Sequence, residues 1–168
     1  MHIAIIIPAY EPNMVLLRLL EELNGLYDSA KYSVEYIIVD DGSLSETSKK
    51  TFAKINHLRR VVVLKHQKNQ GKGAALKTGI KYAHELNVDL IITADADGQH
   101  TADDIKSVGD YACEHQNFTI GSRDFKGGIP VRSQIGNFIT SKLFKLVFKL
   151  NITDTQSGLR AFPSRLFD

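Results

Sequence analysis

Two aspartates, Asp95 and Asp97, stand two positions apart directly after a short apolar run. On an extended chain such side chains point the same way, so both carboxylates are expected to face one ion while Ala96 faces elsewhere. Two hard oxygen donors suit Mg²⁺ or Mn²⁺, which keep several waters and bind substrate phosphates. Gln99 and His100 follow within reach, and of these Gln99 is the expected further ligand. The structural alternative is that these acidic residues end a strand and cap the next helix.

Polar side chains also follow two earlier apolar runs. Tyr10 and Glu11 come after the first run, and Asp40 and Asp41 come after the second. In an open parallel α/β sheet, ligands bind beyond the carboxyl ends of the strands. Charges gathered at one edge of a sheet cost electrostatic energy unless a ligand or metal offsets it. The pattern therefore predicts a binding site at this edge.

Gly71, Lys72 and Gly73 open a helical pattern and allow two interpretations. A helix N-terminus can hold a phosphate group, which would place Lys72 near a diphosphate. The segment lacks the G-x-x-x-x-G-K-[ST] pattern of a P-loop, which favours a role of the glycines in tight packing.

Strand and helix signals alternate along the chain. Apolar runs typical of buried strands occupy residues 3–7, 36–39, 61–64, 90–93 and 118–120, with Pro8 expected to end the first. Apolar residues at helical spacing begin near residues 13, 43, 71 and 101. The pairs Ser43 with Glu46 and Thr101 with Asp104 have the spacing of a capping box. This alternation predicts an α/β fold with a mostly parallel sheet and helices on both faces.

The composition is that of one soluble globular domain. The chain has 168 residues, and 21 Lys and Arg against 19 Asp and Glu give a net charge of +2, too balanced to indicate nucleic-acid binding. A single cysteine, Cys113, excludes an intramolecular disulfide and favours a reducing compartment. No signal peptide is recognisable, and no apolar run approaches the roughly 18–20 residues of a membrane span. Residues 163–168 have the pattern of a first helical turn, so the chain is expected to be a fragment.

Six short motifs occur along the chain in a fixed order. They are Ile5-Ile6-Ile7-Pro8-Ala9-Tyr10, Val39-Asp40-Asp41-Gly42-Ser43, Asn69-Gln70-Gly71-Lys72-Gly73, Asp95-Ala96-Asp97-Gly98-Gln99-His100, Gly121-Ser122-Arg123 and Asp154-Thr155-Gln156-Ser157-Gly158. Together they resemble the family 2 glycosyltransferases of the GT-A fold, and among them most the polyprenyl-phosphate (dolichyl-phosphate) glucosyl- and mannosyltransferases. The resemblance implies a single Rossmann-like GT-A catalytic domain over residues 1–168 that lacks its C-terminal region.

This resemblance implies metal-dependent, inverting transfer of a hexose from a nucleoside diphosphate sugar, with UDP-glucose as the expected donor, to polyprenyl phosphate. Mg²⁺ or Mn²⁺ on Asp95, Asp97 and Gln99 would bridge the two phosphates as a Lewis acid. Arg123 and Arg132 would add fixed positive charge on the leaving diphosphate.

The resemblance also implies which residues hold the nucleotide sugar. They are Pro8, Tyr10, Glu11, Asp40, Asp41, Lys72, Asp95, Ala96, Asp97, Arg123 and Arg132, and the catalytic group comprises Asp97, Arg123 and Asp154. One departure concerns Glu11, because the acidic residue that the family often carries two positions after the Tyr is replaced here by Pro12.

Asp154 is the expected acceptor-side carboxylate. A hydroxyl acceptor needs a general base there, whereas a lipid phosphate is already ionised, so Asp154 would then only orient its neighbours. Residues 133–150 carry an apolar stripe beside Lys142, Lys145 and Lys149. Such a helix either lies on an anionic membrane surface or packs on the core with a solvated lysine edge. A cytoplasmic location at the inner face of the membrane is expected.

Three alternatives remain open at this point. The first is a family 2 transferase with a glycan or polyol hydroxyl as acceptor. The second is a nucleotide-sugar binding module without turnover. A nucleotidyltransferase fits less well, because the first strand is followed by Pro8-Ala9-Tyr10 and not by a glycine-rich phosphate loop.

Overall fold

The computed structural model describes residues 1–27, 31–122 and 157–167. The described strands form one six-stranded sheet in the order β3-β2-β1-β4-β6-β5. The strands are β1 (His2–Ala9), β2 (Ser33–Asp40), β3 (Val61–Lys65), β4 (Leu90–Thr93), β5 (Thr119–Ile120) and β6 (Arg160–Pro163). The helices are α1 (Met14–Leu26), α2 (Glu46–Ile55), α3 (Lys72–Glu85) and α4 (Ala102–His115), and a 3₁₀ turn, η1, spans Ser164–Phe167.

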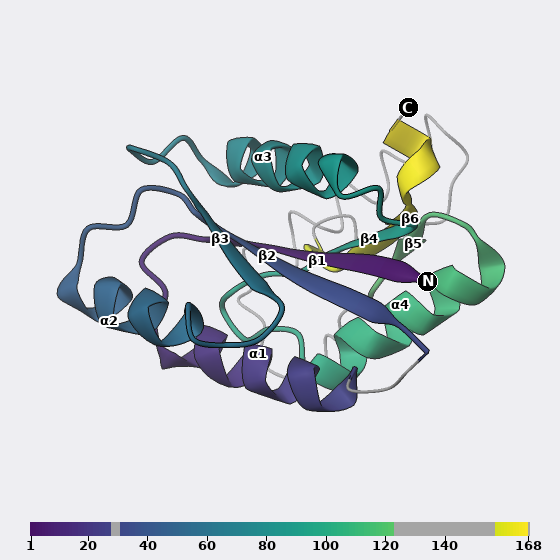
Figure 1. Cartoon of the computed structure of the whole chain (residues 1–168), viewed down its shortest axis with the longest axis horizontal. Coiled ribbons are helices and arrows are strands. Elements are labelled where there is room, and N and C mark those ends of the chain that lie inside the picture. Colours follow the sequence, from purple (N-terminus) through teal and green to yellow (C-terminus); the bar gives the residue numbers. More distant parts are fainter. Residues whose placement is uncertain (28–30, 123–156, 168) are drawn as a thin grey trace.

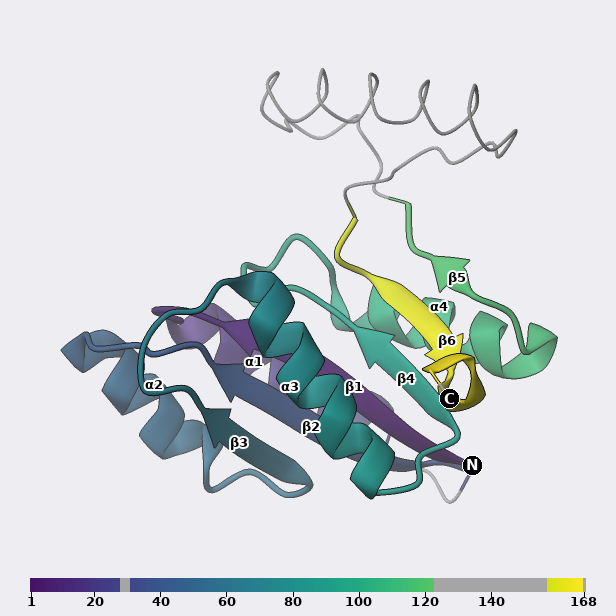
Figure 2. The same ribbon diagram turned by 90° about the horizontal axis from the view of Figure 1, so that it is seen from above.

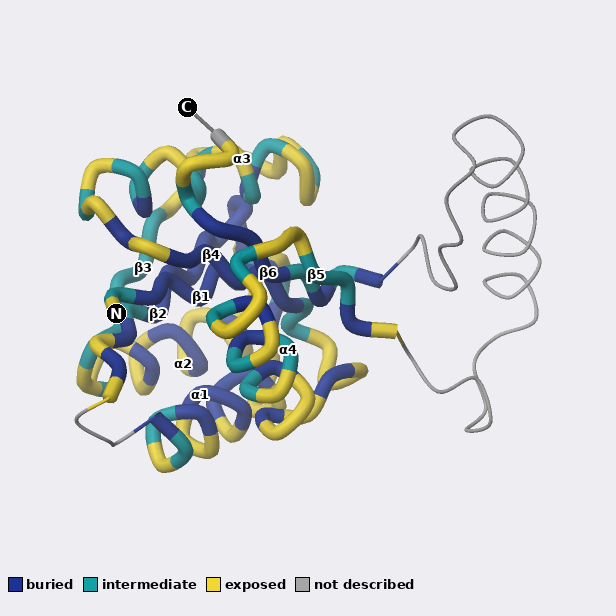
Figure 3. The backbone as a smooth tube through the Cα atoms, turned by 90° about the vertical axis from the view of Figure 1, so that its right-hand side faces the viewer, coloured by how far each residue is buried: buried dark blue, intermediate teal, exposed yellow. Residues whose placement is uncertain are grey.

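The central strand β1 is apolar at every position from Ile3 to Ile7 because helices cover both faces of the sheet. Ile3, Ile5 and Ile7 pack in the core on the face of α1, α2 and α4. Ala4 and Ile6 point to the other face and pack in the core beneath α3. Figure 1 shows α3 on one side of the sheet and α1, α2 and α4 on the opposite side. Figure 3 shows the resulting pattern, with buried central strands and helices exposed on their outer sides.

The order in which strands are added to the sheet reverses at β1, so a topological switch point lies between β1 and β4. Strands β1, β2, β3 and β4 are parallel, and the chain runs outward from β1 through β2 to β3 before returning to place β4 on the other side of β1. Strand β6 is antiparallel to β4 and β5 is antiparallel to β6. Figure 2 shows this order across the sheet. Ligands in open α/β sheets bind at such a switch point, beyond the carboxyl ends of the strands.

The predicted α/β fold with a mostly parallel sheet is confirmed, but Pro8 does not end β1. Pro8 pairs with Val39 and the strand continues to Ala9. The Ile6 carbonyl accepts from the Ala94 N–H, so Pro8, two residues on, also turns its nitrogen toward the β4 side. Strand β4 pairs with β1 only as far as Ile6, so at Pro8 no ladder hydrogen bond is lost.

One prediction about a helix start is wrong. The N-cap of α2 is Ser45, whose hydroxyl accepts from Ser48 N–H, and not Ser43. The helical turn expected over residues 163–168 is present as the 3₁₀ turn η1, but Pro163 precedes it as the last residue of the unpredicted strand β6. The capping box of Thr101 and Asp104 at the start of α4 is confirmed.

Candidate functional site

A cleft of about 430 Å³ opens at the carboxyl ends of β1, β2 and β4, at the switch point of the sheet. Eight of the residues expected to hold the nucleotide sugar line it, namely Pro8, Tyr10, Glu11, Asp41, Lys72, Asp95, Ala96 and Asp97. Five further lining residues had not been assigned to the nucleotide-sugar site, although three of them stand in the motifs; they are Ala9, Asn13, Val15, Asn69 and Gly71. The cleft therefore combines three strand ends with the loop between β3 and α3.

Several expected site residues lie elsewhere. Asp40 faces a separate hollow of about 300 Å³, and its carboxylate accepts from Ser43 N–H at 2.8 Å and pairs with Lys65 Nζ at 3.5 Å. His100 is buried and Gln99 is exposed, and neither is among the cleft-lining residues. Three of the predicted residues lie outside the described residues, namely Arg123, Arg132 and Asp154. The predicted basic helix at 133–150 also lies outside them.

The two aspartates after β4 are less tightly held than Asp41, with Asp97 exposed and Asp95 half-buried. The chain turns at Ala96 and Asp97, so the expected alternation of an extended strand does not hold, yet both carboxylates line the cleft. Asp97 is exposed and accepts from the backbone N–H and the side-chain amide of Gln99, at 3.0 and 2.7 Å. The side chain of Asp95 is 19% exposed and its Oδ1 pairs with Lys72 Nζ at 2.5 Å.

Gly158 closes the other side of Asp95. The hydroxyl of Thr93 donates to the Gly158 carbonyl at 2.9 Å, which ties the turn before β6 to the end of β4. A Cβ atom at Gly158 would overlap the Asp95 carboxylate. The absence of a side chain at Gly158 therefore leaves room for this carboxylate.

Asp41, at the end of β2, is held on several sides by the protein itself. Its Oδ1 lies 2.7 Å from His66 Nδ1 and accepts from Gln70 N–H at 3.0 Å, and its Oδ2 accepts from Gly71 N–H at 2.8 Å. Burial alone would raise the pKa of Asp41, but these hydrogen bonds outweigh it and hold the pKa below its ordinary value. Asp41 is thus an ionised anchor for the loop that leads into α3.

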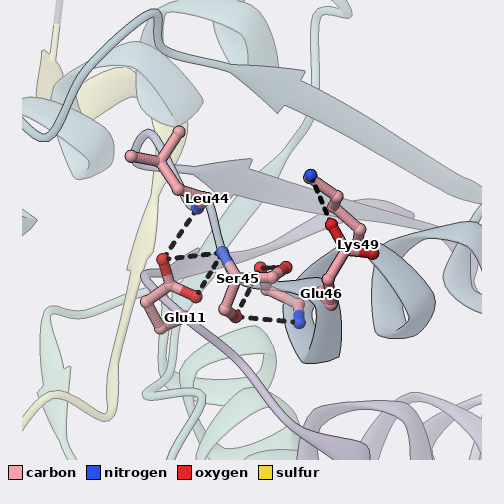
Figure 4. A network of polar contacts seen from close by, with 6 residues as sticks. Glu11, Leu44, Ser45, Glu46 and Lys49 are labelled. Atoms are coloured by element: carbon pink, nitrogen blue, oxygen red, sulfur yellow. Dashed lines mark hydrogen bonds and ion pairs between the residues drawn. The ribbon is translucent and has the colours of Figure 1, made fainter.

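Glu11 joins the loops that follow β1 and β2 (Figure 4). Its carboxylate accepts from Leu44 N–H at 2.7 Å and from Ser45 N–H at 3.2 Å, while its own N–H donates to Ser43 Oγ at 2.9 Å. The hydrogen bonds from Leu44 and Ser45 lower the pKa of Glu11 to about 2. Glu11 therefore shapes the rim of the cleft with a carboxylate that the protein already binds.

The comparisons with known proteins agree with this geometry. Residues 4–168 match the family described as Glycosyl transferase family 2. The chain belongs to this family. This family 2 glycosyltransferase is 37% identical to the UDP-N-acetylglucosamine–dolichyl-phosphate N-acetylglucosaminyltransferase of Methanococcus voltae, over 95% of this chain and 68% of that protein. It is 26% identical to the dolichyl-phosphate beta-glucosyltransferase of Saccharomyces cerevisiae, over 95% of this chain and 54% of that protein.

Solved structures confirm the GT-A fold of this glycosyltransferase. Glucosyl-3-phosphoglycerate synthase from Mycobacterium tuberculosis, solved with Mn²⁺, UDP and glucosyl-3-phosphoglycerate, aligns with a TM-score of 0.70 at 17% identity. The alignment covers 98% of this chain and 57% of that one. The chain thus spans between about half and about two thirds of the length of these relatives.

The carboxylates of Asp95 and Asp97 suit a hydrated divalent cation. The described residues contain no group of three or more His, Cys, Asp or Glu side chains that would enclose an ion. Mg²⁺ and Mn²⁺ do not require such a group, because they keep several waters and bind through one or two carboxylates together with substrate phosphates. Asp95 and Asp97 provide these two carboxylates on the wall of an open cleft.

Proposed function

We propose that this protein transfers glucose or N-acetylglucosamine from a UDP-sugar to polyprenyl phosphate, with inversion at the anomeric carbon. The observation that carries the proposal is the cleft at the switch point, where Asp95 and Asp97 present carboxylates to the same space as the end of β1 and the loop before α3. Relatives named for dolichyl-phosphate acceptors support the lipid phosphate, and they are named for both sugars.

Different residues of the cleft are proposed to contact different parts of the donor. We propose that Pro8, Tyr10 and Asp41 contact the nucleoside and that Asp95 and Asp97 would hold Mg²⁺ or Mn²⁺ near the diphosphate; all five residues line the cleft. The cation, when bound, offsets the negative charge that develops on the leaving UDP. Lys72, whose side chain is 52% exposed and whose ammonium group pairs with Asp95, is proposed to bind the diphosphate when the donor is present.

Arg123 and Arg132 are proposed to add further positive charge at the diphosphate, because a guanidinium group binds phosphate oxygens in a fork geometry. In the transfer itself, an acceptor phosphate oxygen bonds to the anomeric carbon while the bond from that carbon to the diphosphate breaks. UDP leaves with the electron pair.

The acceptor phosphate is ionised at neutral pH, so no proton has to be removed from it during the transfer. We therefore propose that Asp154 orients its neighbours and does not act as a base. Within the described ranges 1–27, 31–122 and 157–167, no helix is long and apolar enough to cross a bilayer. The lysine-rich segment 133–150 is proposed to meet the anionic inner face of the membrane.

A transfer assay on the full-length protein tests the proposal. UDP-glucose and UDP-N-acetylglucosamine are offered with polyprenyl phosphate, or with a polyol or glycan acceptor, in Mn²⁺, Mg²⁺ or EDTA. We expect metal-dependent product only with the lipid phosphate, and substantial turnover by Asp154→Asn. Product only with hydroxyl acceptors, together with a loss of about 10²–10⁴ in rate for Asp154→Asn, contradicts the lipid-phosphate assignment.

A further inference from the structure

His66 is a buried polar residue that joins three parts of the molecule beside the cleft. It follows β3 directly, and its backbone N–H donates to the Asp40 carbonyl at 2.9 Å. Its Nδ1 lies 2.7 Å from Asp41 Oδ1, and its Nε2 lies 2.9 Å from the hydroxyl of Thr78 in α3. Only 9% of the side chain is exposed. The ring therefore links the end of β2, the end of β3 and helix α3.

The hydrogen-bond directions follow from the chemistry of the partners. An ionised Asp41 only accepts, so His66 Nδ1 must carry the proton and donate it. Thr78 can donate to or accept from Nε2, so its hydroxyl suits this tautomer. Of the four acceptor positions on the Asp41 carboxylate, His66, Gln70 and Gly71 occupy three, and the fourth, on Oδ2, has no partner among the described residues. Asp41 is one of the residues that line the cleft.

The orientation of Asp41 also affects residues on the far side of the cleft. Its Oδ2 holds the N–H of Gly71, which is the N-cap of α3 and has a φ of +91° that glycine adopts readily. Lys72 is the next residue, and its ammonium group pairs with Asp95 at the end of β4. A continuous series of contacts thus runs from His66 through Asp41 and Gly71 to Lys72.

We propose that His66 is a positioning residue of the nucleotide-sugar site. By fixing Asp41 it sets the start of α3, leaves one acceptor position of Oδ2 for an N–H or O–H donor of the nucleoside, and places Lys72 between Asp95 and the diphosphate. The ligand part of this proposal rests on the proposed function. The contact part stands on the hydrogen bonds alone, and the experiment separates the two.

Four single variants test the proposal. His66→Leu removes both ring nitrogens, and His66→Asn returns an amide N–H donor toward Asp41. Thr78→Val removes the second anchor of the ring. His57→Asn, at an exposed position just after α2, is the matched control.

The first readout needs no ligand. Carbon NMR follows the titration of the Asp41 carboxyl, and nitrogen NMR follows the Gly71 amide. Loss of the donor in His66→Leu should raise the pKa of Asp41 and shift the Gly71 amide, and His66→Asn should reverse most of both changes. Unchanged Asp41 titration in His66→Leu overturns the positioning role.

The second readout is affinity for UDP and uridine, with melting temperature measured alongside. We expect His66→Leu to weaken UDP on the order of tenfold, Thr78→Val to weaken it less, and His66→Asn to recover most of the loss, as suits one hydrogen bond to a charged group. A loss that follows melting temperature and that His66→Asn does not recover shows a purely structural histidine. If the wild-type protein binds neither ligand, the proposed function fails, and the ligand-free NMR result alone decides the contact part.

Discussion

The end of β2 and the end of β4 each bring two acidic residues to the same edge of the sheet, yet they use them differently. Asp41 is almost completely buried and accepts hydrogen bonds from three residues of the protein. At β4, Asp97 is exposed and Asp95 has a half-exposed lysine as its ion-pair partner. A carboxylate already bound by fixed N–H groups acts as an anchor, whereas one paired with a half-exposed ammonium group can exchange that partner for another cation.

The largest expected effect is at β4. Asp97→Asn should weaken UDP binding in Mn²⁺ by at least about 100-fold, since even residues that only support metal ligands cost about 10–100-fold when lost. The melting temperature should stay unchanged, because exposed substitutions change stability by less than about 0.5 kcal/mol. Calorimetry and thermal melts measure the two quantities, and Asp103→Asn, at an exposed position of α4, is the control. Equal UDP affinity in the two variants would show that the metal does not bind at the end of β4.

The opposite pattern is expected at β2. Asp41→Asn turns an amide donor toward N–H groups that need an acceptor, which costs about 1–3 kcal/mol for each buried group left unpaired. The melting temperature should fall by several degrees, and uridine and UDP should weaken by a similar factor. A stable variant that loses affinity for UDP alone would assign Asp41 to the diphosphate.

A smaller effect is expected where β6 meets β4. In Gly158→Ala the new methyl group displaces the Asp95 carboxylate, and overpacking of this kind costs about 1–3 kcal/mol. Metal-dependent UDP binding should weaken on the order of tenfold, while uridine binding, measured in the same titrations, should not change. Gly25→Ala in α1, where a methyl group meets open space, is the matched control. Equal losses for UDP and uridine would show that the β6 turn supports the whole cleft.

The smallest expected effect is the pH-dependent stability that Glu11 contributes at the rim of the cleft. The pKa of Glu11 is about 2 in the folded protein against an ordinary 4.5, so its ionised form stabilises the fold above pH 4.5. That contribution is lost as pH falls from 4.5 toward 2. Urea midpoints should therefore differ between wild type and Glu11→Gln at pH 6 and converge at low pH. Glu21→Gln, exposed on α1, controls for the lost charge. A difference independent of pH would exclude the carboxylate as its source.

Periodicity and position were enough to predict much of the fold and the place of the cleft. Buried parallel strands read as continuous apolar runs, and the polar residues after them must meet at one edge. Strand β6 was missed because Arg160–Pro163 is short and ends in a proline that also suits a helix start. Its pairing with β4 is a long-range contact that no local pattern indicates.

The use of each carboxylate could not be predicted for a similar reason. The capping-box spacing with Glu46 favoured Ser43 as the cap of α2, but the N–H of Glu11 occupies the Ser43 hydroxyl from 32 residues away. Asp40 and Asp41 are adjacent, and only the fold turns one toward Lys65 and the other toward the loop before α3. His66 gave no signal, because its two partners lie 25 and 12 residues away.

Paramagnetic broadening by Mn²⁺ most directly tests the claim that β4 holds the cation while β2 anchors the loop. Nitrogen-labelled protein is titrated with substoichiometric Mn²⁺ in the presence of UDP, and the intensity of each backbone amide signal is followed. The signals of Asp95, Asp97 and Gly158 should disappear first, while those of Ser43 and Ser45 beyond β2 persist. Earlier loss around Ser43 and Ser45, or uniform loss across the spectrum, would contradict the account.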